Sequence, residues 1–433
     1  MPFEKTTPPR RSVAIVGAGI TGLGAAWRLS QECDVTIYEA EPRLGGHART
    51  IMAGKNGDQP VDTGFIVFNN ANYPNLVRMF EELSVPIAKS TMSFGASVRA
   101  GRMEYGLDGA RAFFAQRRNA VNPRFLGMLR DIFRFNARAV DLSRQQKDLT
   151  IGEFLDRVGT GKWFRDYYLL PLTGAIWSTP TEKILDFPAD AMIRFMENHA
   201  LLNYSGQHQW YTVQGGSQEY VTRLTALLEA RGVSLRPGTP VTGIRRTEVG
   251  AEIRAEGTEW ETYDEVIMAT HGDVSLRLLS DPSEQEHEAL SKVRYQPNDM
   301  VLHADTSVMP RRRAVWSSWN YAEGPARREG QIDITYWMNS LQPIPMDDLH
   351  FVTLNSNRPI KEELIYDQTV LDHPVYDTGM LVAQESVRGF NGTRATWFCG
   401  AWMRNGFHED GLATGLEVAD AILSRDKMPV AAE

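Results

Sequence analysis

The feature that most constrains the fold lies within the first forty residues. Residues 12–16 form a short apolar run, which is typical of a buried parallel strand. This run leads directly into the glycine-rich stretch 17–22 and then into a segment with helical periodicity. A second apolar strand, at 35–38, ends at Glu39. A strand, a glycine turn, a helix, a strand and an acid in this order predict a dinucleotide-binding βαβ unit.

Each residue type in this unit has a physical reason. Gly17 permits a tight turn, Gly19 lets the backbone approach a pyrophosphate, and Gly22 lets the helix pack closely on the strand. The start of the helix offers unpaired N–H groups and the positive end of a dipole to the phosphates. Glu39 can accept hydrogen bonds from the ribose hydroxyls of an adenosine. The pattern does not distinguish FAD from NAD.

The residues after Glu39 distinguish these cofactors by resemblance. Residues 42–50 read Pro-Arg-Leu-Gly-Gly-His-Ala-Arg-Thr, and residues 61–66 read Val-Asp-Thr-Gly-Phe-Ile. These motifs resemble those of the flavin amine oxidase and phytoene desaturase superfamily, which includes monoamine oxidases and protoporphyrinogen oxidases. The resemblance implies FAD, and neither cysteine stands where monoamine oxidases attach their flavin, so we expect it to be noncovalent.

The same resemblance extends to the end of the chain. Residues 233–244 resemble the strand whose valine backbone meets the adenine, and residues 264–270 resemble the return strand. Residues 396–400 and 406–415 resemble the final strand, loop and helix, which approach the ribityl chain and the pyrimidine edge of the flavin. The residues predicted to bind FAD are Gly17, Ala18, Gly19, Ile20, Thr21, Gly22, Glu39, Ala40, Gly45, Gly46, His47, Arg49, Thr63, Gly64, Phe65, Val241, Gly400, Asp410, Gly411 and Leu412.

The predicted fold class is α/β. We expect a Rossmann-type, two-dinucleotide-binding FAD domain and an interleaved α+β substrate domain with a mixed sheet and a helical subregion, since 433 residues exceed one ordinary core. The cofactor motifs assign 1–70, 209–290 and 390–433 to the FAD domain. Residues 71–208 and 291–389 then form the substrate domain. Alternating patterns at 300–305 and 332–337 predict strands, and 110–205 reads as helical.

Composition excludes several classes of protein. A net charge of −8 argues against a nucleic-acid partner. Cys33 and Cys399 are too few and too far apart for a disulfide framework or a metal site, so we expect no metal and a reducing, cytoplasmic location. The N-terminal residues lack the apolar region of a secretory signal, and no apolar run is long enough to cross a bilayer.

The segment 111–147 departs from this acidic average. It holds nine Lys or Arg and two acids, with phenylalanine and aliphatic residues between them. One interpretation is a peripheral, anionic membrane surface as partner, with cations at the head groups and rings at the acyl boundary. The other is an ordinary core-facing helix with a solvated basic side. Arg311–Arg313 and Arg327–Arg328 either extend the basic side or lie in solvated loops.

The predicted activity is that of an FAD-dependent oxidoreductase. Many amine oxidases of the superfamily carry a lysine near flavin N5, and the comparable stretch 296–303 has none. His303 is the candidate catalytic base, because imidazole titrates near neutral pH; a histidine in this position is more often an ordinary strand residue.

A narrower resemblance covers 61–69, 209–213 and 406–411. It is to bacterial NAD/FAD-binding proteins associated with cyclopropane and furan fatty acid synthesis. It implies dehydrogenation of an unsaturated fatty acyl chain of a membrane phospholipid. A soluble flavin amine or small-molecule oxidase and a non-catalytic, flavin-stabilised interaction protein remain as alternatives.

Overall fold

The computed structural model describes residues 10–146, 148–203, 206–323 and 332–425. Lys147 and the predicted basic pair Arg327–Arg328 lie outside these residues. The described elements form the predicted mixed α/β fold, with two large sheets and a separate group of helices. No helix in the described part of the chain is both long and apolar enough to span a membrane.

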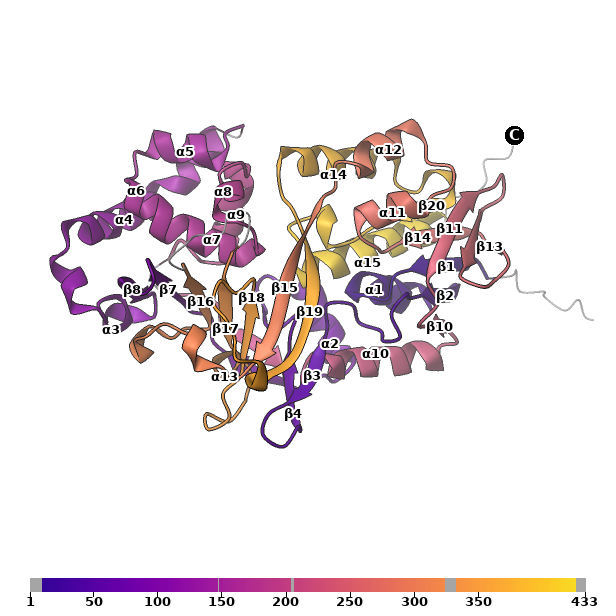
Figure 1. The fold of residues 1–433 in the computed structure, drawn as a ribbon. Helices are drawn as coiled ribbons and strands as arrows, with labels where there is room; N and C mark the ends of the chain where they lie inside the picture. The colour runs from indigo at the N-terminus through magenta and orange to yellow at the C-terminus, as the bar shows by residue number, and fades with distance from the viewer. Residues whose placement is uncertain (1–9, 147, 204–205, 324–331, 426–433) are drawn as a thin grey trace, which may run out of the picture.

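The first sheet is entirely parallel and lies at the right of Figure 1. Its strands, in spatial order, are β10 (Ser234–Arg236), β2 (Asp34–Tyr38), β1 (Ser12–Val16), β14 (Glu265–Met268) and β20 (Thr396–Phe398). Helices α1 (Ile20–Leu29) and α15 (His408–Arg425) pack against each other beside it. The sheet therefore joins strands from the beginning, middle and end of the sequence, as its apolar runs predict.

The second sheet is mixed and occupies the centre of Figure 1. Its strands, in spatial order, are β19 (Ile365–Pro374), β15 (Tyr295–His303), β18 (Phe351–Leu354), β17 (Ile334–Trp337), β16 (Trp319–Ala322), β7 (Phe94–Val98) and β8 (Met103–Gly106). Only the β16–β7 pair is parallel. The strands predicted at 300–305 and 332–337 are confirmed as β15 and β17, and the domain boundaries stay predictions.

Three small sheets complete the described strands. The small sheets are β3 (Thr50–Ala53) with β4 (Gln59–Asp62), β5 (Phe68–Asn69) and β6 (Ile87–Ser90) with β9 (Trp210–Val213), and β11 (Val241–Arg246) with β12 (Ala251–Ala255) and β13 (Glu261–Tyr263). The remaining helices near them are α2 (Pro74–Glu82), α10 (Gln218–Ala230), α11 (Gly272–Leu278), α12 (Glu284–Leu290), α13 (Met338–Leu341) and α14 (Thr378–Phe390).

The predicted helical subregion is confirmed and lies at the upper left of Figure 1. It consists of α3 (Gly109–Phe113), α4 (Pro123–Gln145), α5 (Ile151–Val158), α6 (Lys162–Phe164), α7 (Leu170–Trp177), α8 (Thr181–Ile184) and α9 (Ala189–Asn198). Asn122 caps α4 by accepting from the backbone N–H of Arg124, and Thr150 with Glu153 forms a capping box on α5. These helices bury their apolar sides in the same core as the second sheet.

Candidate functional site

A cavity of about 620 Å³ extends from the first sheet to the second. At one end it is lined by Gly17 and Glu39, which follow the carboxyl ends of β1 and β2. At the other end it is lined by residues of the second sheet and of α7. Ligands of parallel α/β sheets bind at the carboxyl ends of the strands, so this position favours a bound dinucleotide.

At several glycines in and near the turn after β1 there is no room for a side chain. Gly17 has a φ of +103°, and a Cβ there would lie 2.7 Å from the carbonyl oxygen of Ala269. A Cβ at Gly22 would overlap the carbonyl oxygen of Gly17, and one at Gly64 would overlap that of His47. At Gly19 a Cβ would meet no atom within 4 Å, so this backbone faces open cavity. The geometry fits a pyrophosphate lying against the start of α1.

Two further features of the turn fit an anionic cofactor. Helix α1 has no acidic residue in its first turn, and Ile20 and Thr21 line the cavity at its N-terminus. Glu39 is anchored, since its carboxylate accepts from the backbone N–H groups of Ala18 (2.7 Å) and Glu41 (2.9 Å). We call Gly17, Gly19, Glu39, Gly46 and Gly64 the cradle, and its residues fit the adenosine diphosphate part of FAD.

The structure brings about half of the predicted FAD-binding residues to the cavity surface. Those that line it are Gly17, Gly19, Ile20, Thr21, Glu39, Gly46, His47, Thr63, Gly64, Phe65 and Gly400. Ala18, Gly22, Gly45, Gly411 and Leu412 lie one layer behind. Gly45 donates its N–H to the Ala18 carbonyl (2.8 Å), and Leu412 packs against Gly24 of α1.

The cofactor contact of Arg49 stays a prediction, and in the structure its side chain binds other residues of the chain. Its guanidinium forms an ion pair with Asp367 on β19 (2.6 Å) and donates to the Thr63 hydroxyl (3.1 Å). Both partners of the ion pair are largely buried, and Arg49 does not line the cavity. A buried charge needs a partner, so Arg49 joins the segment after the cradle to the second sheet.

Three other predicted residues also lie away from the cavity surface. Ala40 is exposed, and Val241 opens β11 two residues after Thr239, whose N–H binds the Glu39 carbonyl (2.7 Å). Asp410 is buried and accepts from the backbone N–H of Phe407 (3.0 Å) at the start of α15. Burial raises the pKa of its carboxyl to about 6.

The structure does not place the candidate base His303 at the cavity. Its side chain is fully buried in the second sheet, and both ring nitrogens are occupied. Nε2 lies 2.8 Å from the Thr353 hydroxyl, and Nδ1 accepts from the backbone N–H of Asp305 (3.0 Å). Its alternating strand pattern fits either face of a sheet, and the register turns it into the core. We assign it no catalytic role.

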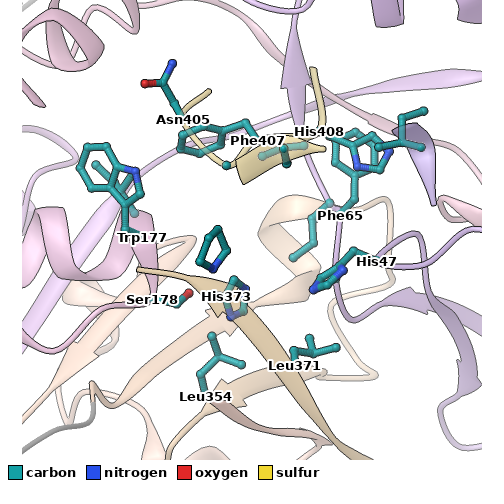
Figure 2. Close-up of a pocket in the computed structure, with 18 of the residues that line it drawn as sticks. His47, Phe65, Trp177, Ser178, Leu354, Leu371, His373, Asn405, Phe407 and His408 are labelled. Carbon is teal, nitrogen blue, oxygen red and sulfur yellow. The ribbon is translucent and has the colours of Figure 1, made fainter. Parts of the chain in front are cut away.

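The far half of the cavity is lined mainly by apolar and aromatic side chains. We call Trp177, Phe195, Tyr336, Leu354 and Leu371 the apolar wall. Figure 2 shows Leu354 and Leu371 on one side of the cavity and Trp177 and Phe407 on others. Among the described residues that line the cavity, none is Lys or Arg, and the carboxylates are Glu39, Asp108 and Asp372. Such a lining accepts an uncharged, elongated group more readily than an anion.

Histidines gather between the cradle and the apolar wall. The ring of His47 lies 5.9 Å from that of His373 and 6.5 Å from that of His271, measured between centroids, and His271 stacks on Tyr295 at 4.0 Å. Burial lowers the pKa of His47 to about 3 and that of His373 to about 4. Burial also lowers the pKa of His271. These rings are therefore neutral at pH 7.

The hydrogen bonds of His373 fix its tautomer. Its Nδ1 lies 2.9 Å from the side-chain nitrogen of Asn298, while the Asn298 oxygen accepts from Asn355 (2.6 Å). Because Asn298 is the donor, Nδ1 is the acceptor and the proton of the neutral ring is on Nε2. The ring also makes a hydrogen bond to the Leu371 backbone, so a ligand would share the N–H of His373 with that group. The ring of His47 has no hydrogen-bond partner among the described residues, so a lone pair remains for a ligand.

A fourth histidine, His408, lines the cavity from the side of α15. His408 stacks on Phe65 with ring centroids 3.9 Å apart, and its Nε2 lies 2.7 Å from the Tyr220 hydroxyl. Figure 2 shows Phe407 and His408 across the cavity from His373 and Leu371. Burial lowers the pKa of His408 to about 3. This contact orients Phe65, one of the residues that the sequence predicts to bind FAD.

Sequence reasoning missed most of these histidines. His271, His373 and His408 come from three segments that are distant in the sequence, and none stands in a spacing that indicates chemistry. His408 lies in the motif 406–411, where the sequence indicates only a helix cap. For His373, the alternating pattern of residues 365–374 signals an antiparallel strand without indicating which side faces the cavity.

Comparisons with known proteins agree with this geometry. Residues 20–313 match the family model described as flavin containing amine oxidoreductase. The chain is 25% identical to coproporphyrinogen III oxidase of Staphylococcus aureus over 302 residues, which are 61% of this chain and 62% of that protein. It is 49% identical to protoporphyrinogen oxidase 2 of Arabidopsis thaliana over 43 residues, which are 10% of this chain and 8% of that protein. The chain thus spans less than two thirds of both relatives.

Solved structures share the fold over nearly the whole chain. Cyclohexylamine oxidase from Brevibacterium oxydans superposes with a TM-score of 0.69 at 14% identity, covering 97% of this chain and 100% of that one. A fatty acid isomerase from P. acnes that produces CLA superposes with a TM-score of 0.66 at 16% identity, covering 97% and 99%. At this level of identity the likeness establishes the architecture and not the substrate.

Proposed function

Since the chain belongs to the flavin-containing amine oxidoreductase family, it is an FAD-dependent oxidoreductase, and we propose that it dehydrogenates an unsaturated fatty acyl chain of a phospholipid. The observation that carries the proposal is the apolar wall. An acyl chain offers only C–H groups, and the wall contributes aromatic and aliphatic surface that removes such groups from water. An allylic C–H bond is the weakest in such a chain and is the natural point of hydride loss.

The bound FAD supplies the hydride acceptor. The residues of this chain bind, orient and desolvate the substrate around it. Trp177, Tyr336 and Leu354 line the space where the alkyl chain would lie and exclude water from it. Dehydrogenation also releases a proton, and we assign its relay to His47, which lines the cavity and whose pKa of about 3 means that it would pass the proton on rather than hold it. The Nε2–H of His373 would donate a hydrogen bond to a polar group of the substrate close to the acyl chain and so orient it.

A small-molecule oxidase is the second candidate, and it is favoured by the identity to coproporphyrinogen III oxidase. A porphyrinogen carries carboxylates, which are usually bound by Arg or Lys. None of the described cavity-lining residues is Arg or Lys. An amine would instead need an acid, and Asp372 beside His373 provides one. An acyl chain matches the chemistry of more of the cavity-lining residues than a porphyrinogen or an amine does.

The deciding experiment is anaerobic mixing of the FAD-loaded protein with vesicles of monounsaturated phospholipid. We expect the flavin absorbance to bleach and a diene to appear in the extracted lipid. Vesicles with saturated chains should leave the flavin oxidised, because they contain no allylic C–H. Bleaching by amines or porphyrinogens, with none by the unsaturated lipid, would reject the acyl substrate.

Neighbouring residues on β19 provide a matched pair of variants. Leu371 lines the cavity, whereas Val370 points to solvent with 55% of its side chain exposed. Leu371→Glu places a charge in the apolar wall and should reduce bleaching by unsaturated lipid at least tenfold. Val370→Glu adds the same charge outside the cavity and should leave the rate within about twofold. Equal rates in the two variants would show that the wall does not bind the substrate.

A further inference from the structure

The end of the molecule that carries α3 and the start of α4 is strongly basic. We define the basic face as Arg111, Arg117, Arg118, Arg124, Arg311 and Arg313, all of which are exposed. Among the described residues, no carboxylate lies within ion-pair distance of Arg111, Arg117, Arg118 or Arg124. This concentration of positive charge contrasts with the net charge of −8 of the whole chain.

The fold brings the two basic segments of this face together from positions about two hundred residues apart. The turn Arg313–Val315 packs against both α3 and β8. Glu104 of β8 is fully buried, and its carboxylate binds the backbone N–H of Arg311 (2.8 Å) and the Arg312 guanidinium (2.7 Å). The acid that holds the segments together is thus buried, and the surface charge of the face is left uncancelled.

Apolar side chains project between these cations. Val121 is 80% exposed and lies between Arg118 and Arg124, and Leu126 is 41% exposed one turn into α4. Other apolar residues of the segment are buried in the core, including Phe113, Phe125 and Phe135. The core-facing interpretation of 111–147 is therefore correct for one side of α4. The other side combines exposed apolar tips with arginines, which is the composition of a membrane-surface site.

The cavity reaches this same end of the molecule. Leu107 and Asp108 line the cavity and directly precede α3, on which Arg111 lies. Tyr168 and Leu172 from the helical subregion line the cavity as well. A lipid whose head group lies at the basic face would therefore have the cavity within reach of its acyl chain.

We propose that the basic face docks this protein on an anionic phospholipid bilayer. The exposed arginines bind the negatively charged head groups, while Val121 and Leu126 enter the interfacial layer. The identification of the cavity as the destination of the acyl chain rests on the proposed function. The docking itself rests only on the charge and exposure of the face.

Vesicle sedimentation of the FAD-loaded protein tests the docking without measuring turnover. We expect binding to vesicles that mix phosphatidylglycerol with phosphatidylcholine, weaker binding as NaCl is raised, and little binding to phosphatidylcholine alone. The triple variant Arg117→Glu, Arg118→Glu, Arg124→Glu should bind the anionic vesicles at least tenfold more weakly. Arg124 lies near the start of α4, where a glutamate suits the helix dipole, so folding should be preserved.

A second triple variant controls for net charge. Arg78→Glu, Arg254→Glu, Arg277→Glu makes the same change at exposed positions on the FAD-binding side, and it should bind anionic vesicles like the unaltered protein. Equal losses in the two triples, or equal binding to neutral vesicles, would overturn the docking site. Tight binding of the basic face to RNA, with none to vesicles, would overturn it as well. Vesicle binding without bleaching by unsaturated lipid would retain the docking and reject the acyl substrate.

Discussion

The two halves of the cavity are built on different principles. The cradle presents backbone to its ligand, and it comes mainly from residues 17–64, where glycines let main-chain atoms approach closely. The apolar wall presents side chains from separate elements, including α7, α9, β17, β18 and β19. Backbone recognition depends on the absence of side chains, whereas a wall of side chains depends on summed volume and polarity.

Because of this difference, the two halves should tolerate amino-acid substitutions to different degrees. The cradle cannot accept one added methyl group at several positions without moving the backbone. The wall can exchange apolar residues of similar volume at small cost, and so one architecture can serve different substrates. Variants of the two halves should therefore separate cofactor binding from turnover.

The largest effect is expected at Gly22, one layer behind the cradle. In Gly22→Ala the added Cβ would overlap the carbonyl oxygen of Gly17, so α1 must move away from β1 and from the phosphate position. We expect purified protein to retain less than about a tenth of its flavin, because the N–H groups that face the pyrophosphate lose their alignment. Flavin absorbance relative to protein measures this loss.

Gly127→Ala is the matched control for that change. Gly127 lies inside α4, and a Cβ there meets no atom within 4 Å. Full flavin content and a gain of about 0.5–1 kcal/mol in stability are expected, since alanine is the better helix former. Full flavin content in Gly22→Ala would mean that the cofactor does not depend on the packing of α1 against β1.

A smaller effect, on turnover and not on flavin content, is expected at His373, which lies between the two halves of the cavity. His373→Leu removes the Nε2–H from the cavity while keeping an apolar side chain of similar reach. Flavin content should stay unchanged, and the rate of bleaching by substrate should fall about ten- to a hundredfold. His287→Leu, at an exposed position of α12, serves as the control and should not alter the rate. Loss of flavin in His373→Leu would instead assign this residue to cofactor binding.

The cradle could be predicted from the sequence because its determinants are local. Gly17, Gly19, Gly22 and Glu39 stand in one βαβ unit, where spacing alone fixes their relative positions. Arg49 was assigned to the cofactor by resemblance; that assignment stays a prediction, and its ion pair with Asp367, more than three hundred residues away, could not be read from local spacing. The mixed sheet was likewise predictable from alternation, although its order was not.

The wall could not be predicted, because it exists only after long-range packing. Its side chains come from five separate elements, and the neighbouring His47, His271 and His373 likewise meet through contacts between segments that no periodicity records. His303 shows the reverse error. A histidine on an alternating strand satisfies any sequence criterion for a base, yet the register of β15 against β18 places it beside Thr353 in the core.

The smallest effect concerns acid stability, in which two buried titrating groups, His373 at the cavity and Asp410 behind its surface, oppose each other. Burial lowers the pKa of His373 to about 4, against about 6.5 in an unfolded chain, so the unfolded state takes up this proton first and stability is lost as the pH falls below 6.5. Each such histidine contributes a loss of about 0.7 kcal/mol between pH 7.5 and pH 6. Burial raises the pKa of Asp410 to about 6, so the folded state takes up that proton first and stability is gained over the same interval, by about 0.4 kcal/mol.

Single variants should therefore change the acid dependence in opposite directions. His373→Leu should shrink the loss of stability between pH 7.5 and pH 6 by about 0.7 kcal/mol, whereas Asp410→Asn should enlarge it by about 0.4 kcal/mol. Urea unfolding of each variant at the two pH values measures both differences. Changes of the same sign would contradict the assignment, because a histidine whose pKa is lowered and a carboxyl whose pKa is raised must act in opposite directions over this interval. Opposite signs would show that burial acts on a cation-forming group at His373 and on an anion-forming group at Asp410.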